Sequence, residues 1–193
     1  MNNLRIKAIF ICLNFASVAG CGGAAQNVTV SEFTGEHAKY FENGVDFISD
    51  PDALDERWSE EWQRDLENRT DLSDFVGIAN ITTLVADQSP ERQTSYRLVA
   101  SIIRAMQGES PTEELSLAVA GDDAGYPVVE SNQQRILNRR FAVFIKWYRK
   151  SKNEVVARWH LSPASEKLIG RLEGLVSRKH STKKYVHVVV HKD

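Results

Sequence analysis

The sequence predicts an α+β fold, a small and mainly antiparallel five-stranded barrel with flanking helices near residues 51–69 and 163–178. The chain of 193 residues is 42% hydrophobic and 26% charged, which is typical of one globular domain and excludes a disordered or coiled-coil chain. Runs rich in β-branched and aromatic residues recur between turn signals through its middle. Asp50 before Pro51 and Ser162 before Pro163 each predict a helix start.

The first helix is predicted from Pro51, which follows the capping residue Asp50, to about residue 69. Apolar side chains recur there at every fourth position and form one stripe of a helix. The members of this stripe are Leu54, Trp58, Trp62 and Leu66. Because both Trp share the stripe with Leu residues, we expect them to anchor the core.

The strands are predicted in five segments, separated by polar or Gly-containing breaks. These segments are residues 75–85, 96–106, 115–119, 141–148 and 155–161. Their number and spacing favour a closed or nearly closed barrel.

Helical and terminal elements complete this prediction. Residues 131–137 are compatible with a short helix. Ser162 is expected to cap the second flanking helix, which would end near residue 178. A short strand over residues 185–190 would end the chain.

The N-terminus has the pattern of a secretory signal. Arg5 and Lys7 precede a run of about 12 mostly apolar residues, which is too short to span a hydrocarbon core of about 30 Å. Small residues follow at a suitable cleavage position. A buried N-terminal helix is the alternative.

The residues that end this segment are more specific. They read Val18-Ala19-Gly20-Cys21, which resembles the lipobox of bacterial lipoproteins. The resemblance implies cleavage before Cys21 and a diacylglycerol thioether on its sulfur, with a further acyl chain on the new amine. Two or more acyl chains hold a protein durably on a membrane. Gly22, in place of the Asp that signals inner-membrane retention in this family, favours the outer membrane. The alternative is an ordinary secreted protein with an unpaired Cys21.

These features give a domain plan and limit the chemistry. A signal peptide covers residues 1–20, a tether 21–36 and one globular domain 37–193. Because Cys12 would leave with the signal peptide and Cys21 would carry lipid, the domain would have no disulfide, thiolate metal site or Cys nucleophile.

The segment 74–148 resembles the netrin and tissue-inhibitor-of-metalloprotease type of OB barrel. The motifs that carry the resemblance are Ala105-Met-Gln-Gly108, after the second strand, and the strand region 137–145. The cysteines of the animal proteins are absent, so the resemblance implies an OB-like barrel and no function.

Charge is distributed unevenly along a chain of net charge −2. Residues 31–75 hold 14 Asp and Glu against 4 Lys and Arg, whereas residues 132–193 hold 15 Lys and Arg against 4 Asp and Glu. The acidic helix face could pack near the basic half. Alternatively, the basic half binds anionic partners such as lipid head groups, lipopolysaccharide or an acidic patch of another envelope protein. Candidate residues for such a surface are Arg135, Arg139, Arg140, Lys146, Arg149, Lys150 and Lys152.

Nucleic acid is not expected as a partner, since the net charge is not basic and the protein would lie outside the cytoplasm. Catalytic motifs of hydrolases, P-loop proteins, dinucleotide-binding proteins and zinc proteases are absent from the sequence. We therefore expect a lipid-anchored, non-catalytic binding or structural module of the bacterial envelope, without a cofactor.

Three weaker candidates for chemistry remain. His160 and Ser162 could serve an envelope hydrolase, although a strand end and a helix cap already explain them and are the favoured interpretation. His187 and His191 would lie about 13 Å apart on a strand, too far to share a metal ion. Asp122 and Asp123 supply too few oxygens for Ca²⁺ and fit a solvated turn.

Overall fold

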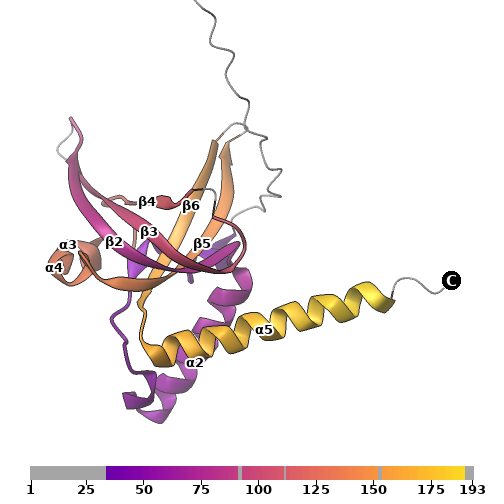
Figure 1. The fold of residues 1–193 in the computed structure, drawn as a ribbon. Coiled ribbons are helices and arrows are strands. Elements are labelled where there is room, and N and C mark those ends of the chain that lie inside the picture. The colour runs from indigo at the N-terminus through magenta and orange to yellow at the C-terminus, as the bar shows by residue number, and fades with distance from the viewer. Residues whose placement is uncertain (1–33, 91–92, 111, 152–153, 190–193) are drawn as a thin grey trace, which may run out of the picture.

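The computed structural model describes residues 34–90, 93–110, 112–151 and 154–189. The predicted signal peptide and Cys21 lie outside the described residues. A six-stranded mixed sheet is the centre of the fold, with strand order β1-β6-β5-β2-β3-β4 (Figure 1). The strands are β1 (Gly44–Val45), β2 (Phe75–Gln88), β3 (Thr94–Gln107), β4 (Glu114–Val119), β5 (Arg140–Ser151) and β6 (Glu154–Pro163).

The expectation of a closed or nearly closed five-stranded barrel is corrected by this topology. β1 and β4 are the two edges of the sheet and do not pair with each other, so the sheet is open. All neighbours are antiparallel except β1, which pairs in parallel with β6. The five predicted segments all lie within strands β2 to β6, so the α+β class and the antiparallel pairing are correct.

The central strands of this open sheet bury both of their faces. Along β5, Phe141, Val143 and Ile145 pack into one core, while Ala142 and Phe144 pack into a second core on the opposite face. A barrel would enclose only one face of each strand. The second apolar face needs a layer of its own, and helices supply it.

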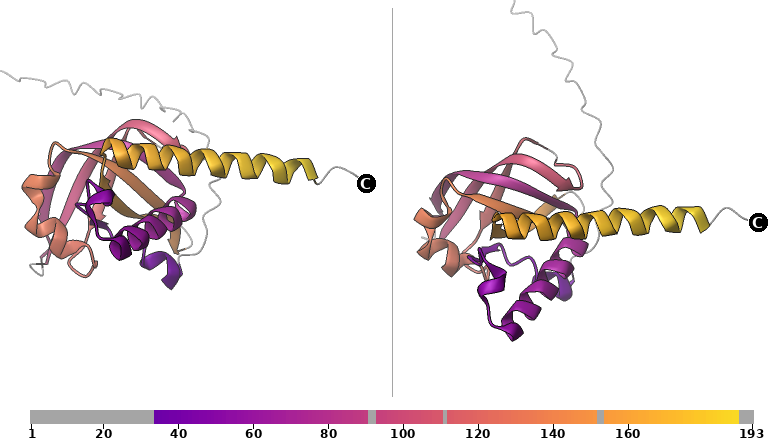
Figure 2. Two further views of the ribbon diagram at one scale, coloured as in Figure 1. Left: turned by 90° about the horizontal axis from the view of Figure 1, so that it is seen from below. Right: turned by 60° about the horizontal axis from the view of Figure 1, so that its bottom comes forward.

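The helices are α1 (Gly35–Ala38), α2 (Glu56–Leu72), α3 (Tyr126–Ser131), α4 (Gln133–Ile136) and α5 (Glu166–Val189), with a 3-10 turn η1 (Pro51–Ala53). Helices α2 and α5 lie side by side on one face of the sheet (Figure 2). Their buried side chains on that face are Trp62, Leu66, Leu168 and Leu172. Helices α3 and α4 contribute Val129 and Ile136 to the core on the other face.

The first flanking helix differs from its prediction at both ends. Asp50 caps only η1, and α2 begins after a second cap, in which Asp55 Oδ1 accepts a hydrogen bond from Trp58 N at 3.1 Å. Leu54 therefore precedes α2, and the apolar stripe loses its first member. Trp62 is 8% exposed, as expected of a core anchor, whereas Trp58 is 58% exposed and the expectation for it is wrong.

The C-terminal half of the second helix also departs from the prediction. α5 continues to Val189, so the strand expected over 185–190 is wrong for its described part. No Gly or Pro interrupts the chain between Gly174 and Val189, and a helix can therefore continue through the β-branched residues. Figures 1 and 2 show α5 projecting beyond the sheet.

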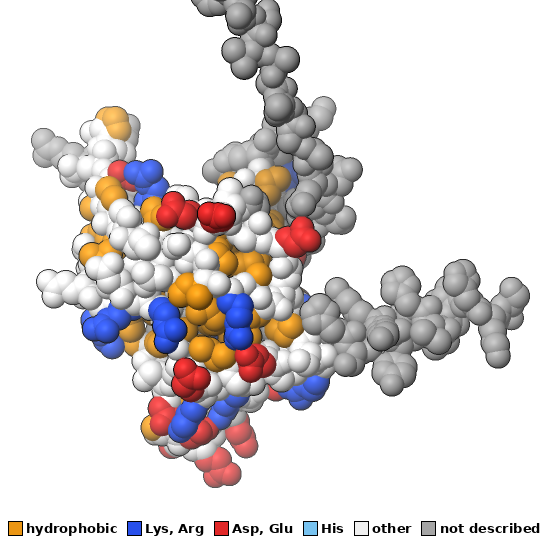
Figure 3. Space-filling model, viewed as in Figure 1, with side chains coloured by type: hydrophobic (Ala, Val, Ile, Leu, Met, Phe, Trp, Pro, Cys, Tyr) orange, Lys and Arg blue, Asp and Glu red, His pale blue; other side chains and the backbone are white. Residues whose placement is uncertain are grey.

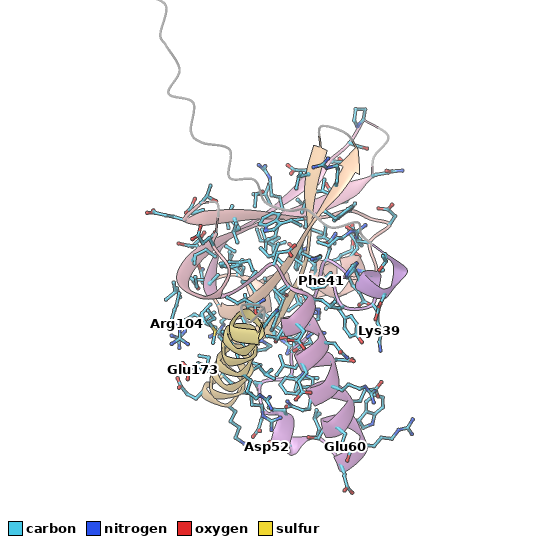
Figure 4. The ribbon with its side chains drawn as sticks, turned by 90° about the vertical axis from the view of Figure 1, so that its right-hand side faces the viewer. Lys39, Phe41, Asp52, Glu60, Arg104 and Glu173 are labelled. Carbon is cyan, nitrogen blue, oxygen red and sulfur yellow. The ribbon has the colours of Figure 1, made fainter. Side chains whose placement is uncertain are left out.

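Ion pairs fix α5 to its surroundings. Arg104 on β3 pairs with Glu173 on α5 at 3.0 Å, and Figure 4 shows the two side chains close together. Lys167 pairs with Asp50, which caps η1, and with Asp52 inside η1, and Arg171 also pairs with Asp52. The interpretation in which acidic N-terminal residues pack near basic C-terminal ones therefore holds for this part of the molecule.

Apolar side chains stay exposed over the middle of the sheet above α5, with Lys and Arg side chains beside them (Figure 3). In the part of the chain that the structure describes, no helix is both long enough and apolar enough to cross a bilayer.

Candidate functional site

A cleft of about 490 Å³ lies where α4, the start of β5 and the β6–α5 connection meet. Three of its lining residues are arginines from the predicted basic surface, Arg135, Arg139 and Arg140. We call this feature the arginine cleft. Its other lining residues are Phe47, Ser49, Gln134, Phe141, Pro163, Ala164 and Ser165.

Backbone hydrogen bonds fix the turn that carries two of these arginines. Asn138 adopts a φ of 59°, a left-handed conformation that Asn tolerates, and its N–H donates to Ile81 O at 2.7 Å. Ile81 N in turn donates to Arg139 O at 3.0 Å, and Ala164 N donates to Arg140 O at 3.1 Å. The main chain at Arg139 and Arg140 is therefore attached to both β2 and the start of α5.

The third arginine is oriented by its side-chain contacts. The Arg135 guanidinium lies 4.0 Å from the centroid of the Phe47 ring, a cation–π geometry. It also donates from Nη1 to Asn132 Oδ1 at 3.0 Å. These two contacts hold a charged group at the wall of the cleft before any ligand arrives.

The arginine cleft has an excess of positive charge. All three arginines are exposed, and none of them forms an ion pair with an Asp or Glu among residues 34–189 as far as the structure describes them. Asp46, Asp50 and Glu166 each adjoin a lining residue in sequence, but none of the three lines the cleft. An anion could therefore enter without displacing an internal carboxylate.

The structure divides the predicted basic surface. Lys146 is 7% exposed, and its Nζ donates to Asp74 Oδ1 at 2.7 Å, so its charge is matched inside the fold. Arg149 is exposed but lies nine residues along β5 from Arg140, about 30 Å away at ~3.3 Å per residue. The side chain of Lys150 and the whole of Lys152 lie outside the described parts. Of the five candidates whose side chains the structure describes, three share one cleft.

A second site gathers buried polar groups from β6 and from the segment after β1. His160 Nε2 lies 3.0 Å from Asp46 Oδ2, and Ser162 Oγ donates to the same oxygen at 2.6 Å. Arg69 Nη1 lies 4.0 Å from it. The parallel pairing of β1 with β6 places Asp46 beside these residues, because Asp46 N donates to Leu161 O at 3.0 Å.

The electrostatics of this cluster favour a neutral histidine and an ionised aspartate. Burial, together with the positive charge of Arg69, lowers the pKa of His160 to about 4. Burial alone would raise the pKa of Asp46, but the hydrogen bonds from His160 and Ser162 outweigh it and the pKa lies below its ordinary value. His160 Nε2 is then the N–H donor toward the carboxylate.

The cluster lacks the hydrogen bond that a nucleophilic serine needs. Ser162 is fully buried and donates to Asp46 rather than to His160. With the proton of His160 on Nε2, toward the carboxylate, the nitrogen that could act as a base is Nδ1, and no hydrogen bond joins it to Ser162 within the described residues. The expectation that Ser162 caps α5 is also wrong: Ser165 Oγ accepts from Leu168 N at 3.2 Å. Sequence reasoning missed Asp46, for which the only signal is one carboxylate within the apolar run 44–48.

Of the two aspartates considered for Ca²⁺, Asp123 has a structural role. Asp123 Oδ2 accepts from Asn43 Nδ2 at 2.9 Å and from Ala120 N at 2.8 Å, and Asp123 also binds Arg158. The expectation of a solvated turn is therefore corrected for Asp123. No group of three or more His, Cys, Asp and Glu suited to a metal ion occurs within the described ranges.

The C-terminal histidines and a second cleft are two other places with candidate groups. The helical backbone of α5 includes His187, so the strand geometry assumed for His187 and His191 does not hold, and His191 lies outside the described ranges. A larger cleft of about 580 Å³ between β3 and the loop before α3 includes Ser95, Gly121 and Tyr126, but Asp122 is its one charged lining residue. The arginine cleft is the stronger candidate because its charge selects a class of ligand.

Comparison of the chain with protein-family models, with curated proteins and with solved structures gives no match.

Proposed function

We propose that this protein is a lipid-anchored, non-catalytic binding module of the bacterial envelope, and that its arginine cleft binds an anionic group. The observation that carries the binding function is that Arg135, Arg139 and Arg140 all line one cleft, where the described chain offers them no acidic partner. Guanidinium groups without an internal carboxylate partner favour the binding of carboxylate or phosphate groups.

The membrane anchor rests on the sequence. The lipobox residues end at Cys21, and acyl chains on that residue would hold the domain at a membrane surface. Gly22 favours the outer membrane as the location. At such a surface, an anionic ligand could be a lipid head group, a soluble metabolite or an acidic patch of another envelope protein.

The hydrolase interpretation receives less support from the geometry. It gains a close acid, since Asp46 lies within hydrogen-bond distance of His160. However, Ser162 would have to break its bond to Asp46 and move toward His160 before it could act as a nucleophile. The present hydrogen bonds instead link β6 to the segment that follows β1.

The anchor is tested by replacing Cys21 with Ser in a bacterial host and fractionating the cells. We expect the parent protein in the membrane fraction with the added mass of acyl chains, and we expect the variant to lose that mass and its tight membrane attachment. An acyl-free parent protein would overturn the anchor and leave the cleft unaffected.

Anion binding is tested by thermal unfolding in sulfate, phosphate or malonate, against chloride at equal ionic strength. A ligand that binds only the folded state raises Tm. We expect a rise for the parent and for Arg149→Gln, and a smaller rise for Arg139→Gln and Arg140→Gln. An equal response in all four proteins would overturn the proposed function.

A further inference from the structure

The arginine cleft also restricts the chemistry of its ligand, provided that it binds anions as proposed above. We infer that it takes a phosphate monoester, with the phosphoryl group on Arg135, Arg139 and Arg140 and the organic group on the apolar wall. The inference rests on the number of guanidinium groups, on their arrangement and on the mixed lining of the cleft.

The charge and the donor count of the cleft match a phosphoryl group. Three guanidinium groups carry three positive charges, and each presents a planar fork of N–H donors. A carboxylate carries one negative charge and two oxygens, which one fork can satisfy. A phosphate monoester carries a charge of about −1.5 to −2 near pH 7 and three terminal oxygens, so it can engage all three arginines.

Orientation of the arginines supports the same ligand. Arg135 is held by the Phe47 ring and by Asn132 Oδ1, and therefore loses less side-chain freedom on binding than a free surface arginine. Arg139 and Arg140 are consecutive residues on a hydrogen-bonded turn. One arginine is thus fixed in advance, while the other two extend from an ordered backbone.

The remaining lining fits the organic part of a monoester. Phe47, Phe141, Pro163 and Ala164 give the cleft an apolar side, and Ser49 and Gln134 add neutral polar groups. The volume of about 490 Å³ lies within the range of small-molecule sites and greatly exceeds the need of inorganic phosphate alone. The first turn of α5, which follows the capping residue Ser165, contributes the positive end of a helix dipole beside the cleft.

The test is isothermal titration of the full chain, purified in uncharged detergent micelles, with two probes of similar charge. Glycerol 3-phosphate is a phosphate monoester, and malonate is a dicarboxylate. We expect glycerol 3-phosphate to bind at least about tenfold more tightly than malonate, because only the phosphoryl group engages three forks. We also expect its affinity to fall with added salt, since the arginines are exposed.

Variants assign the binding to the cleft. Arg139→Gln and Arg140→Gln should each weaken glycerol 3-phosphate binding about tenfold, since each removes a charge-assisted hydrogen bond. Arg149→Gln is the matched control, with the same charge change on the same strand, and should bind within about twofold of the parent. Arg135→Lys keeps the charge and removes the fork, so it should also bind more weakly, with circular dichroism confirming that each variant is folded.

The source of the phosphoryl group is resolved by adding phosphatidic acid to the same micelles. Displacement of glycerol 3-phosphate would identify a lipid head group as an accepted ligand, and undiminished binding would identify a soluble ester; both support the inference. Equal affinity for malonate and glycerol 3-phosphate, lost together in the arginine variants, would overturn the phosphoryl assignment and leave anion binding intact. Failure of both probes to bind would overturn the inference and count against the proposed function as well.

Discussion

Asp46 and His160, 114 residues apart in the chain, are joined by a hydrogen bond of 3.0 Å between Oδ2 and Nε2. Ser162 donates to the same Asp46 oxygen, and Arg69 lies nearby, so one carboxylate serves three side chains from two distant parts of the sequence. The two-residue strand β1 is held at the sheet edge partly by this carboxylate, which follows it directly.

The first prediction concerns acid stability. His160 has a folded-state pKa of about 4 against 6.5 when unfolded, so the unfolded state binds the proton first as the pH falls. Stability is therefore fully present above pH 6.5 and declines between about 6.5 and 4, by on the order of 3 kcal/mol in total. The lowered pKa of Asp46 adds a further loss below its ordinary value of 3.8.

Urea denaturation at several pH values between 7.5 and 4.5 measures this decline. His160→Gln is the control, because the Gln amide can still donate toward Asp46 but does not titrate in this range. Its unfolding free energy should depend less steeply on pH than that of the parent. Parallel pH profiles for the two proteins would contradict the assignment to His160.

The second prediction concerns Ser162. Ser162→Ala removes a buried donor to the Asp46 carboxylate, and we expect a loss of about 1–3 kcal/mol in the free energy of unfolding. We expect neither the parent nor the variant to hydrolyse p-nitrophenyl acetate above the buffer rate, and we expect both to bind the anion probes alike. Hydrolysis by the parent that Ser162→Ala abolishes would favour the hydrolase.

The third prediction concerns Lys146, which the sequence grouped with the exposed basic residues. Lys146→Met leaves Asp74 with the backbone N–H of Trp147 as its remaining partner, so we expect a loss of about 2 kcal/mol in the free energy of unfolding. Arg149→Met should change that free energy by less than about 0.5 kcal/mol, because Arg149 is exposed. Equal effects of the two changes in denaturant melts would contradict the structural role of Lys146.

The fourth prediction concerns a close contact between two glycines. A Cβ at Gly125 would lie 2.3 Å from Asn43 O and 2.4 Å from Gly44 Cα, both of which are backbone atoms. We therefore expect Gly125→Ala to lower the free energy of unfolding by at least about 2 kcal/mol. At Gly174, on an open side of α5, Ala meets nothing within 4 Å and should raise it by about 0.5–1 kcal/mol. Thermal unfolding compares the two, and a harmless Gly125→Ala would show that the contact can relax.

The fold was predictable from the sequence where local patterns decide the structure. The strand predicted over 141–148 lies within β5, and the helix predicted over 51–69 shares most of its length with α2. Barrel closure was not predictable in this way. β1, with two residues, is too short to leave a periodic signal, and whether the edges β1 and β4 pair is a long-range contact that no local pattern reports.

The arginine cleft was only partly predictable. The charge count identified Arg135, Arg139 and Arg140, but nothing local distinguishes them from Lys146, whose partner Asp74 lies 72 residues earlier in the chain. Phe47 and Ser49 could not be assigned to the cleft, since they reach it only through tertiary contacts. Long-range pairing, rather than composition, decides which charges are left without partners.

The walls of the arginine cleft come from three separate stretches of chain, represented by Phe47, Arg140 and Ser165. These stretches separate when the protein unfolds, so the cleft exists only in the native state. A bound ligand consequently contacts the beginning, middle and end of the domain and stabilises their native arrangement. Its binding adds RT ln(1 + [L]/Kd) to the unfolding free energy. The Tm therefore rises with the concentration of any anion that the cleft binds.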